Sequence, residues 1–244
     1  MTKLSVNLNK IALLRNSRGR DFPNVVDFAE KFISRGVHGI TVHPRQDERH
    51  ITRQDVRDLS RLLSCDGEVE FNIEGYPSED FLQLVEEVKP KQCTLVPDSP
   101  EQLTSDHGWD LSQDGEYLAT ICERLNGQGI RTAIFLDPSL EQVERVKATH
   151  AHRIELYTET LAAAYGTPEF DSVLAKFKAV ATRAQELGIE VNAGHDLDLQ
   201  NLPHFLTIPD IKEVSIGHVL MIECIEQGLD SVVEQYLDIC RQSA

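Results

Sequence analysis

The chain has 244 residues, 41% of them hydrophobic and 26% charged, which is the composition of an ordinary globular protein with a buried core. Its formal net charge of −16 argues against nucleic acid and anionic membrane surfaces as partners. No apolar run approaches the roughly 18 residues that span a bilayer, the first residues lack the apolar core of a signal peptide, and the five cysteines are scattered, so we expect reduced thiols in a cytoplasmic protein.

Short β-branched runs alternate with amphipathic helical stretches along the chain. Glycines stand where three of these helices should end, at Gly36, Gly129 and Gly188. The expected strands cover residues 3–8, 38–43, 69–74, 92–97, 131–136, 152–157, 189–193 and 213–216. Eight such repeats of about 30 residues predict a (β/α)8 TIM barrel with extra helices, filling residues 1–244 as a single domain.

A doubly wound open sheet is the alternative fold. That fold usually carries a G-x-G-x-x-G turn after its first strand, whereas this chain has Asn7-Leu8-Asn9-Lys10 there. Three segments fall outside the barrel repeat. They are a long loop over 9–22, a loop near 98–110 and a C-terminal helix near 229–242.

Cationic side chains gather after the first two expected strands. Arg15 and Arg18 follow the strand that ends at Asn7, and one helical turn separates them, so both could reach one anion. Arg45 and His50 follow the second strand in a short loop, where a guanidinium fork suits phosphate. Because parallel strands deliver their carboxyl ends to one mouth of a barrel, these groups are expected at an active site.

Three residues at strand ends are candidate proton carriers. His43 ends the second strand, Glu74 the third, and His195 follows the seventh. Histidine titrates near neutral pH, and a carboxyl group in a partly dry mouth can be raised towards it. Glu155 lies inside the apolar sixth strand, where a carboxylate is costly unless it has a partner, and this favours a place in the site.

Glycines at the last two strand ends favour an anion site. In barrels a phosphate often binds to the loops after strands seven and eight, against the N-terminus of a short helix. Gly194 ends strand seven, and Gly217-His218 stands where strand eight passes into a helix. Each could be a plain turn glycine, but the pair at both expected positions favours phosphate binding.

A metal site is the less favoured alternative. Zinc could be bound by His43, His195, His218 and Glu74, but no H-x-H or H-E-x-x-H motif stands at a strand end. Metal-free acid–base catalysis is therefore our main hypothesis. Two others stay open: a metal-dependent hydrolase or lyase that acts on a sugar phosphate, and a non-catalytic barrel that binds phosphorylated metabolites.

The sequence resembles the pyridoxine 5′-phosphate synthase family of vitamin B6 biosynthesis. The resemblance is carried by collinear motifs over nearly the whole chain: V-N-L-N-K-I-A-L-L-R-N-S-R-G at 6–19, G-I-T-V-H-P-R-Q-D-E-R-H-I-T at 39–52, F-N-I-E-G at 71–75, L-V-P at 95–97, V-N-A-G-H at 191–195 and I-G-H at 216–218. It implies a (β/α)8 barrel with extra helices that assembles as a homo-octamer and uses no metal or organic cofactor.

The resemblance also implies a reaction, the condensation of 1-deoxy-D-xylulose 5-phosphate with 3-amino-2-oxopropyl phosphate. By motif position, His43 and Glu74 would accept protons, His195 would donate one, and Glu155 would stabilise charge in a transition state. The deoxyxylulose phosphate would be held by Asn9, Lys10, Arg45, His50 and Thr104. The amino ketone phosphate would be held by Asn7, Arg18, Asp196, Gly217 and His218.

Three features depart from the family pattern. Many members have Asp-His where this chain has Asn9-Lys10, and Gly where it has Asp196. The stretch before Glu74 is also a few residues longer. A lysine can still bind phosphate, whereas Asp196 could contribute only its backbone N–H, because its carboxylate would repel an anion.

Overall fold

A closed barrel of parallel strands forms the centre of the computed structural model, which describes residues 1–98, 102 and 104–243. Each strand pairs with the next along the chain, and the last pairs with the first. The strands are β1 (Lys3–Asn7), β2 (Gly39–Val42), β3 (Glu70–Gly75), β4 (Gln92–Leu95), β5 (Arg131–Leu136), β6 (Arg153–Tyr157), β7 (Glu190–Gly194) and β8 (Ile211–Ile216). The predicted (β/α)8 barrel is therefore confirmed.

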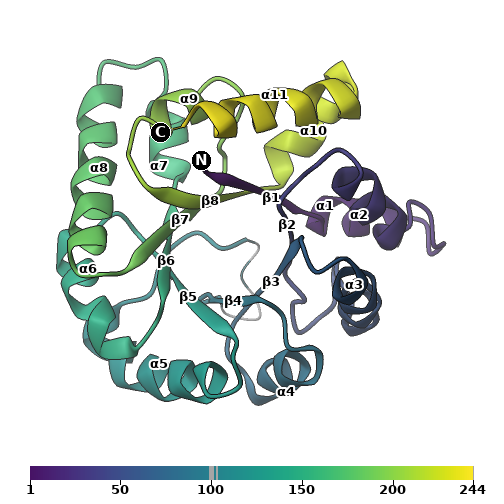
Figure 1. Cartoon of the computed structure of the whole chain (residues 1–244), viewed down its shortest axis with the longest axis horizontal. Helices are drawn as coiled ribbons and strands as arrows, with labels where there is room; N and C mark the ends of the chain where they lie inside the picture. The colour runs from purple at the N-terminus through teal and green to yellow at the C-terminus, as the bar shows by residue number, and fades with distance from the viewer. Residues whose placement is uncertain (99–101, 103, 244) are drawn as a thin grey trace.

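Helices form an outer ring around these strands, as the end-on view of Figure 1 shows. In the described part of the chain they are α1 (Asn9–Asn16), α2 (Val25–Ile33), α3 (Arg53–Asp66), α4 (Glu79–Val88), α5 (Leu111–Asn126), α6 (Leu140–Val146), α7 (Glu159–Ala164), α8 (Phe170–Glu186), α9 (Leu202–Phe205), α10 (His218–Gln227) and α11 (Leu229–Gln242), with a 3-10 turn at Lys147–Thr149. Within residues 1–98, 102 and 104–243, every helix is too short or too polar to span a bilayer.

The two chain ends meet at the amino-terminal side of the barrel. The Thr2 N–H donates to the carbonyl of Cys240, so α11 packs next to the start of β1. The N and C marks accordingly lie close together in Figure 1. The loops that carry the candidate site residues lie at the opposite mouth of the barrel, where the strands end.

Within the described residues, the elements expected from sequence agree with the structure except after β1; residues 99–101 and 103 of the loop expected near 98–110 lie outside the described part of the chain. Strand boundaries differ by at most two residues, and the C-terminal helix is present as α11. The expected loop over 9–22 is wrong in its first half, where α1 forms. The buried residues of α1 are Ile11, Ala12 and Arg15. Because Arg15 is charged, the sequence does not show the apolar periodicity of a helix there. The predicted left-handed glycines are confirmed, with φ of 86°, 80° and 80° at Gly36, Gly129 and Gly188.

The interior of the barrel is polar, although the sequence had suggested a buried charge there only at Glu155. Alternate strand residues such as Leu4, Val6 and Ile40 belong to the apolar core. The others join in hydrogen bonds from strand to strand inside the barrel: Ser5 to Thr41, Asn72 to Thr41, Thr94 to Asn72 and Thr94 to Glu155. Barrel interiors are more often filled by branched apolar residues. These hydrogen bonds stabilise the buried polar groups, and the row of polar side chains leads up to the site.

Candidate active site

His43 lies directly after β2, and its backbone is bonded to the start of α1. Its backbone N–H donates to Asn9 Oδ1 at 2.9 Å, so the start of α1 holds the end of β2 in place. The imidazole is buried and lies edge-on to His50, with ring centroids 6.2 Å apart. Burial, and after it the positive charge of Arg45, holds the pKa of His43 well below its usual value. His43 is therefore a neutral imidazole that can accept a proton.

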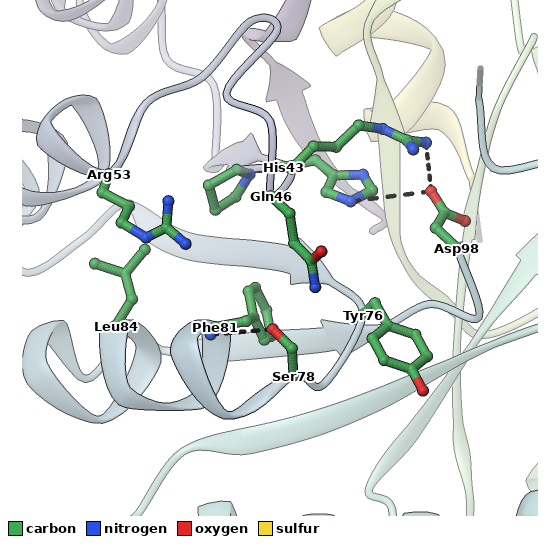
Figure 2. Close-up of a pocket in the computed structure, with 10 residues that line it drawn as sticks. His43, Gln46, Arg53, Tyr76, Ser78, Phe81, Leu84 and Asp98 are labelled. Atoms are coloured by element: carbon green, nitrogen blue, oxygen red, sulfur yellow. Dashed lines mark hydrogen bonds and ion pairs between the residues drawn. The ribbon is translucent and has the colours of Figure 1, made fainter. Parts of the chain in front are cut away.

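Arg45 is buried beside His43 and is paired with a carboxylate. Its Nη2 forms an ion pair with Asp98 Oδ2, and its Nη1 donates to the carbonyl of Gln102 at 2.9 Å. Ser105 Oγ also donates to Asp98 Oδ2, at 2.7 Å. Figure 2 shows this arrangement, with dashed lines that run to Asp98 from both the guanidinium and the His43 ring. The guanidinium that the sequence assigned to a phosphate thus has a protein anion as its partner.

Glu74 is the last residue but one of β3, and its side chain is buried at the barrel mouth. Asn7 Nδ2 donates to Glu74 Oε2 at 3.4 Å, which joins the ends of β1 and β3. Burial, followed by repulsion from Glu155, raises the pKa of Glu74 well above its usual value. Burial also raises the pKa of Glu155, with Glu213 below it adding to the rise. Burial therefore favours the protonated form of both carboxyl groups, and a raised pKa suits an acid–base role.

His195 lies in a short left-handed segment after β7. His195 and Asp196 have φ of 75° and 54°, a conformation that Asp tolerates better than most residues and Gly best. Thr158 Oγ1 donates to the carbonyl of His195, and Asn201 Nδ2 donates to that of Asp196 at 3.1 Å, and these bonds hold the turn. Desolvation among the rings of Phe135 and Tyr157 lowers the pKa of His195 to about 4. Like His43, it is a neutral imidazole near pH 7.

The second candidate anion position lies where β8 passes into α10. Gly217 precedes the first turn of this ten-residue helix, which begins at His218. A Cβ on Gly217 would lie 2.9 Å from the Cβ of Asn7, so the glycine allows the ends of β1 and β8 to approach closely. Backbone N–H groups at a helix N-terminus attract anions. The Gly217 turn, Asn7 and Glu74 therefore share one side of the mouth.

The structure brings together most of the residues chosen from sequence. The contacts given above join eight of them, namely Asn7, Asn9, His43, Arg45, His50, Glu74, Glu155 and Gly217. Lys10 lies near enough to His50 and His195 to lower the pKa values of both. Burial lowers the pKa of His50 to about 4. By contrast, Arg18, Thr104 and His218 are exposed, and among the described residues no hydrogen bond or ion pair joins them to the other site residues.

Arg15 requires a correction. The expectation that Arg15 and Arg18 could grip one anion is wrong for Arg15, which is buried and bonded through both terminal nitrogens to Asp55. Its Nη2 also donates to the carbonyl of His50 at 3.2 Å. Arg15 therefore positions the His50 loop against α3, and it is not available to a ligand.

Asp98 is the site residue that sequence reasoning missed. It follows Val96-Pro97 directly after β4, where the sequence predicts only the start of a loop. A carboxylate one or two residues past a strand end was the signal that could have found it. In the described ranges, no group of three or more His, Cys, Asp or Glu side chains is arranged to hold a metal ion.

Fold and site together define a (β/α)8-barrel protein whose carboxyl mouth carries imidazoles, carboxyl groups of raised pKa and cations. A likeness to solved structures agrees with the fold alone: the phosphoribosyl anthranilate isomerase of Thermotoga maritima matches with a TM-score of 0.62 at 12% identity, covering 99% of each chain.

Sequence comparison identifies the family. The model of one family, described as the pyridoxal phosphate biosynthesis protein PdxJ, matches residues 4–242, and the chain belongs to this family. It is 50% identical over 242 residues to the pyridoxine 5′-phosphate synthase of Bacteroides fragilis, covering 99% of this chain and 100% of that protein. The protein of the same name from Christiangramia forsetii is 47% identical over 242 residues, with the same coverage. The family resemblance seen in the motifs is confirmed.

Proposed function

We propose that this chain is a pyridoxine 5′-phosphate synthase, which condenses 1-deoxy-D-xylulose 5-phosphate with 3-amino-2-oxopropyl phosphate to give pyridoxine 5′-phosphate, phosphate and water. The observation that carries the proposal is the convergence of three proton-exchanging groups, His43, Glu74 and His195, on one barrel mouth with positions suited to anions, in a chain of this family. Two phosphorylated substrates need two anion sites. Imine formation, elimination and ring closure need a series of proton transfers more than one strong nucleophile.

The substrate contacts form two groups on either side of the proton carriers. We assign the deoxyxylulose phosphate to the β2 side, where Asn9, Lys10, Arg45, His50 and Thr104 would hold it. We assign the amino ketone phosphate to the side of the Gly217 turn, where Asn7, Arg18, Gly217, His218 and the backbone N–H of Asp196 would hold it. The closeness of Asn7 to Gly217 supports the second group.

The charges of the site set the order of proton movements in this proposal. His43 begins as a neutral imidazole and accepts a proton, and Glu74, once it has lost its own proton, is a stronger base than an ordinary carboxylate. His195 must be protonated before it can donate. Cations at Arg45 and Lys10 lower the pKa of His195, so a phosphate that neutralises them raises it and prepares this donor. Glu155, in contact with Thr94 below the site, would stabilise the charge of a transition state.

A two-substrate assay tests the proposal. Purified protein given both phosphorylated substrates should form a pyridinol chromophore with and without a metal chelator. Loss of activity with the chelator, together with stoichiometric bound zinc, would favour a metal-dependent hydrolase or lyase instead. Absence of product at every substrate concentration would overturn the proposal.

Two variants test the assigned proton carriers. His43→Ala and Glu74→Gln should each lower kcat by about 100- to 10,000-fold, the usual contribution of a general acid or base. His150→Asn is a matched control, because this exposed histidine lies before β6 at the other end of the barrel. Circular dichroism should show an intact fold in all three. Near-normal turnover in either site variant would reject the role of that residue.

Assembly and location extend the same proposal. We propose a cytoplasmic homo-octamer, as the family resemblance implies. Exposed apolar side chains on α1 and α10, namely Leu13, Leu14, Ile222 and Ile225, support subunit contacts on that side of the barrel. Among the described cysteines, Cys93, Cys122 and Cys240 are buried free thiols, which fits a reducing compartment. Light scattering should give eight times the 27.5 kDa chain mass, and a monomeric mass would contradict the assembly.

A further inference from the structure

The carboxylate of Asp98 lies between a proposed proton acceptor and a proposed phosphate ligand. Its side chain is 3% exposed, and its Oδ2 is paired with Arg45 and lies 3.9 Å from His43 Nε2. Its Oδ1 is buried, and among the residues that the structure describes it has no hydrogen-bond partner. A buried carboxylate oxygen without a partner is costly. The present arrangement therefore leaves part of the bonding capacity of Asp98 unused.

A phosphate group at Arg45 would compete directly with Asp98. Both anions need the same guanidinium, and a phosphate carries more charge and more acceptor oxygens than a carboxylate. A buried carboxylate that loses its cation must find another one. The nearest group that can become cationic is the His43 imidazole. Asp98, His43 and Arg45 line one cavity of about 30 Å³, so a shift of about 1 Å towards hydrogen-bond distance has room.

We propose that Asp98 is a positioning residue that couples phosphate binding at Arg45 to proton transfer at His43. Its carboxylate pairs with Arg45 as long as no phosphate is bound. When a phosphate group binds this guanidinium, the carboxylate moves to His43 Nε2. The inference rests on the proposed function, which assigns Arg45 to a phosphate and His43 to proton transfer. A carboxylate at Nε2 fixes the proton there and leaves Nδ1 to accept the proton from substrate. Phosphate binding thereby turns His43 into a better base.

The charges around His43 give the direction of the effect. Arg45 and Arg49 face the imidazole as cations and oppose its protonation, whereas His50 and His195, which also face it, have pKa values of about 4 and are neutral near pH 7. A phosphate on Arg45 cancels the largest of these charges and frees the Asp98 carboxylate to stabilise the imidazolium. Both changes raise the pKa of His43, but only the second one requires Asp98.

A binding measurement separates this role from a merely structural one. Asp98→Asn keeps the shape of the side chain but removes the competing charge, so inorganic phosphate should bind several-fold more tightly than to the wild type. If Asp98 only held the loop together, the same substitution would weaken phosphate binding. Asp98→Glu keeps the charge and should bind phosphate within about twofold of the wild type. Asp106→Asn, an exposed aspartate in the same loop, is the matched control and should also stay near the wild-type Kd.

Imidazole NMR titrations follow the transfer itself. Saturating inorganic phosphate should shift the titration midpoint of His43 to higher pH in the wild type and in Asp98→Glu. The shift should be less than half as large in Asp98→Asn. Equal shifts in the wild type and Asp98→Asn, or weaker phosphate binding in Asp98→Asn, would overturn the inference.

Steady-state kinetics test whether the substitution changes kcat and KM separately. In Asp98→Asn, kcat should fall by at least about tenfold, while KM for the deoxyxylulose phosphate stays level or falls. A rise in KM with unchanged kcat would overturn the positioning role. The binding and NMR experiments need no turnover, so they test this inference even if the wild type proves inactive as a synthase. Conversely, an active wild type with an unaffected Asp98→Asn variant would remove this inference and leave the proposed function in place.

Discussion

Two arginines one helical turn apart show how differently single residues of the same type are used. Arg15 is 9% exposed and bonded to Asp55 through both terminal nitrogens, whereas Arg18 is exposed after the end of α1. The carboxylate of Asp55 also accepts the N–H of Thr52 and so caps α3. One arginine therefore stabilises the fold, and the other remains a candidate ligand for phosphate.

Alanine substitution should separate these roles. Arg15→Ala leaves the Asp55 carboxylate buried without its cation, so the free energy of unfolding should fall by about 3 kcal/mol. Arg18→Ala should change stability by less than about 0.5 kcal/mol but raise KM for the amino ketone phosphate. Urea unfolding and steady-state kinetics on both variants provide the check. Equal stability losses would show that the two arginines are used alike.

The sequence predicted which candidate site residues lie at strand ends, but not the side-chain pairs that hold them. His43, Arg45 and Glu74 could be predicted because parallel strands of a barrel must end at one mouth. The Arg15–Asp55 and Arg45–Asp98 pairs join residues 40 and 53 positions apart. No local pattern specifies such pairs, because each depends on which loops the barrel brings side by side.

At the scale of elements, the close approach of β1 and β8 positions the second candidate anion site. Gly217 has an ordinary negative φ of −130°, so its value lies in the space it leaves for Asn7 and not in left-handed backbone. Asn7 in turn bonds to Glu74, as well as accepting the N–H of Asn9 at 3.0 Å. Because Gly217 has no side chain, the ends of β1, β3 and β8 can pack together with the starts of α1 and α10.

A pair of glycine substitutions tests this dependence. In Gly217→Ala the new Cβ meets Asn7 at 2.9 Å, and we expect a loss of about 1–3 kcal/mol of stability together with a clear loss of kcat. Gly115→Ala is the matched control: it lies within α5 with nothing near its Cβ, so it should stabilise the protein by about 0.5–1 kcal/mol. Thermal unfolding and the product assay distinguish them. A Gly217→Ala enzyme with normal stability and turnover would contradict the proposed packing.

For the whole molecule, the polar barrel interior makes stability depend on pH in a specific direction. Glu74, Glu155 and Glu213 are all buried, and burial raises the pKa of each. In the unfolded chain these carboxyl groups lose their protons at the ordinary value of about 4.3. Above that pH the folded state binds more protons than the unfolded state, so stability must fall as the pH rises through the higher folded pKa values.

Removal of one carboxyl group should reduce this loss. From pH 5 to pH 8, Glu155→Gln should lose less stability than the wild type, by up to about 1.4 kcal/mol per pH unit over the range between the folded and unfolded pKa values. Glu116→Gln, which removes an exposed carboxylate on α5, should follow the wild-type pH dependence. Urea unfolding at a series of pH values measures these slopes. A slope for Glu155→Gln that matches the wild type would show that Glu155 is not held protonated in the fold.

The sequence by itself determined the barrel, the strand boundaries to within two residues and the family, because hydrophobic periodicity and collinear motifs are local properties of the chain. It also placed His43, Glu74 and His195 at strand ends. Only the tertiary structure decided that Arg15 is occupied by Asp55, that Asp98 holds Arg45 beside His43, and that the barrel interior is polar. These are pairings between side chains from different repeats. Their free energy depends on burial and distance, which exist only once the barrel has closed.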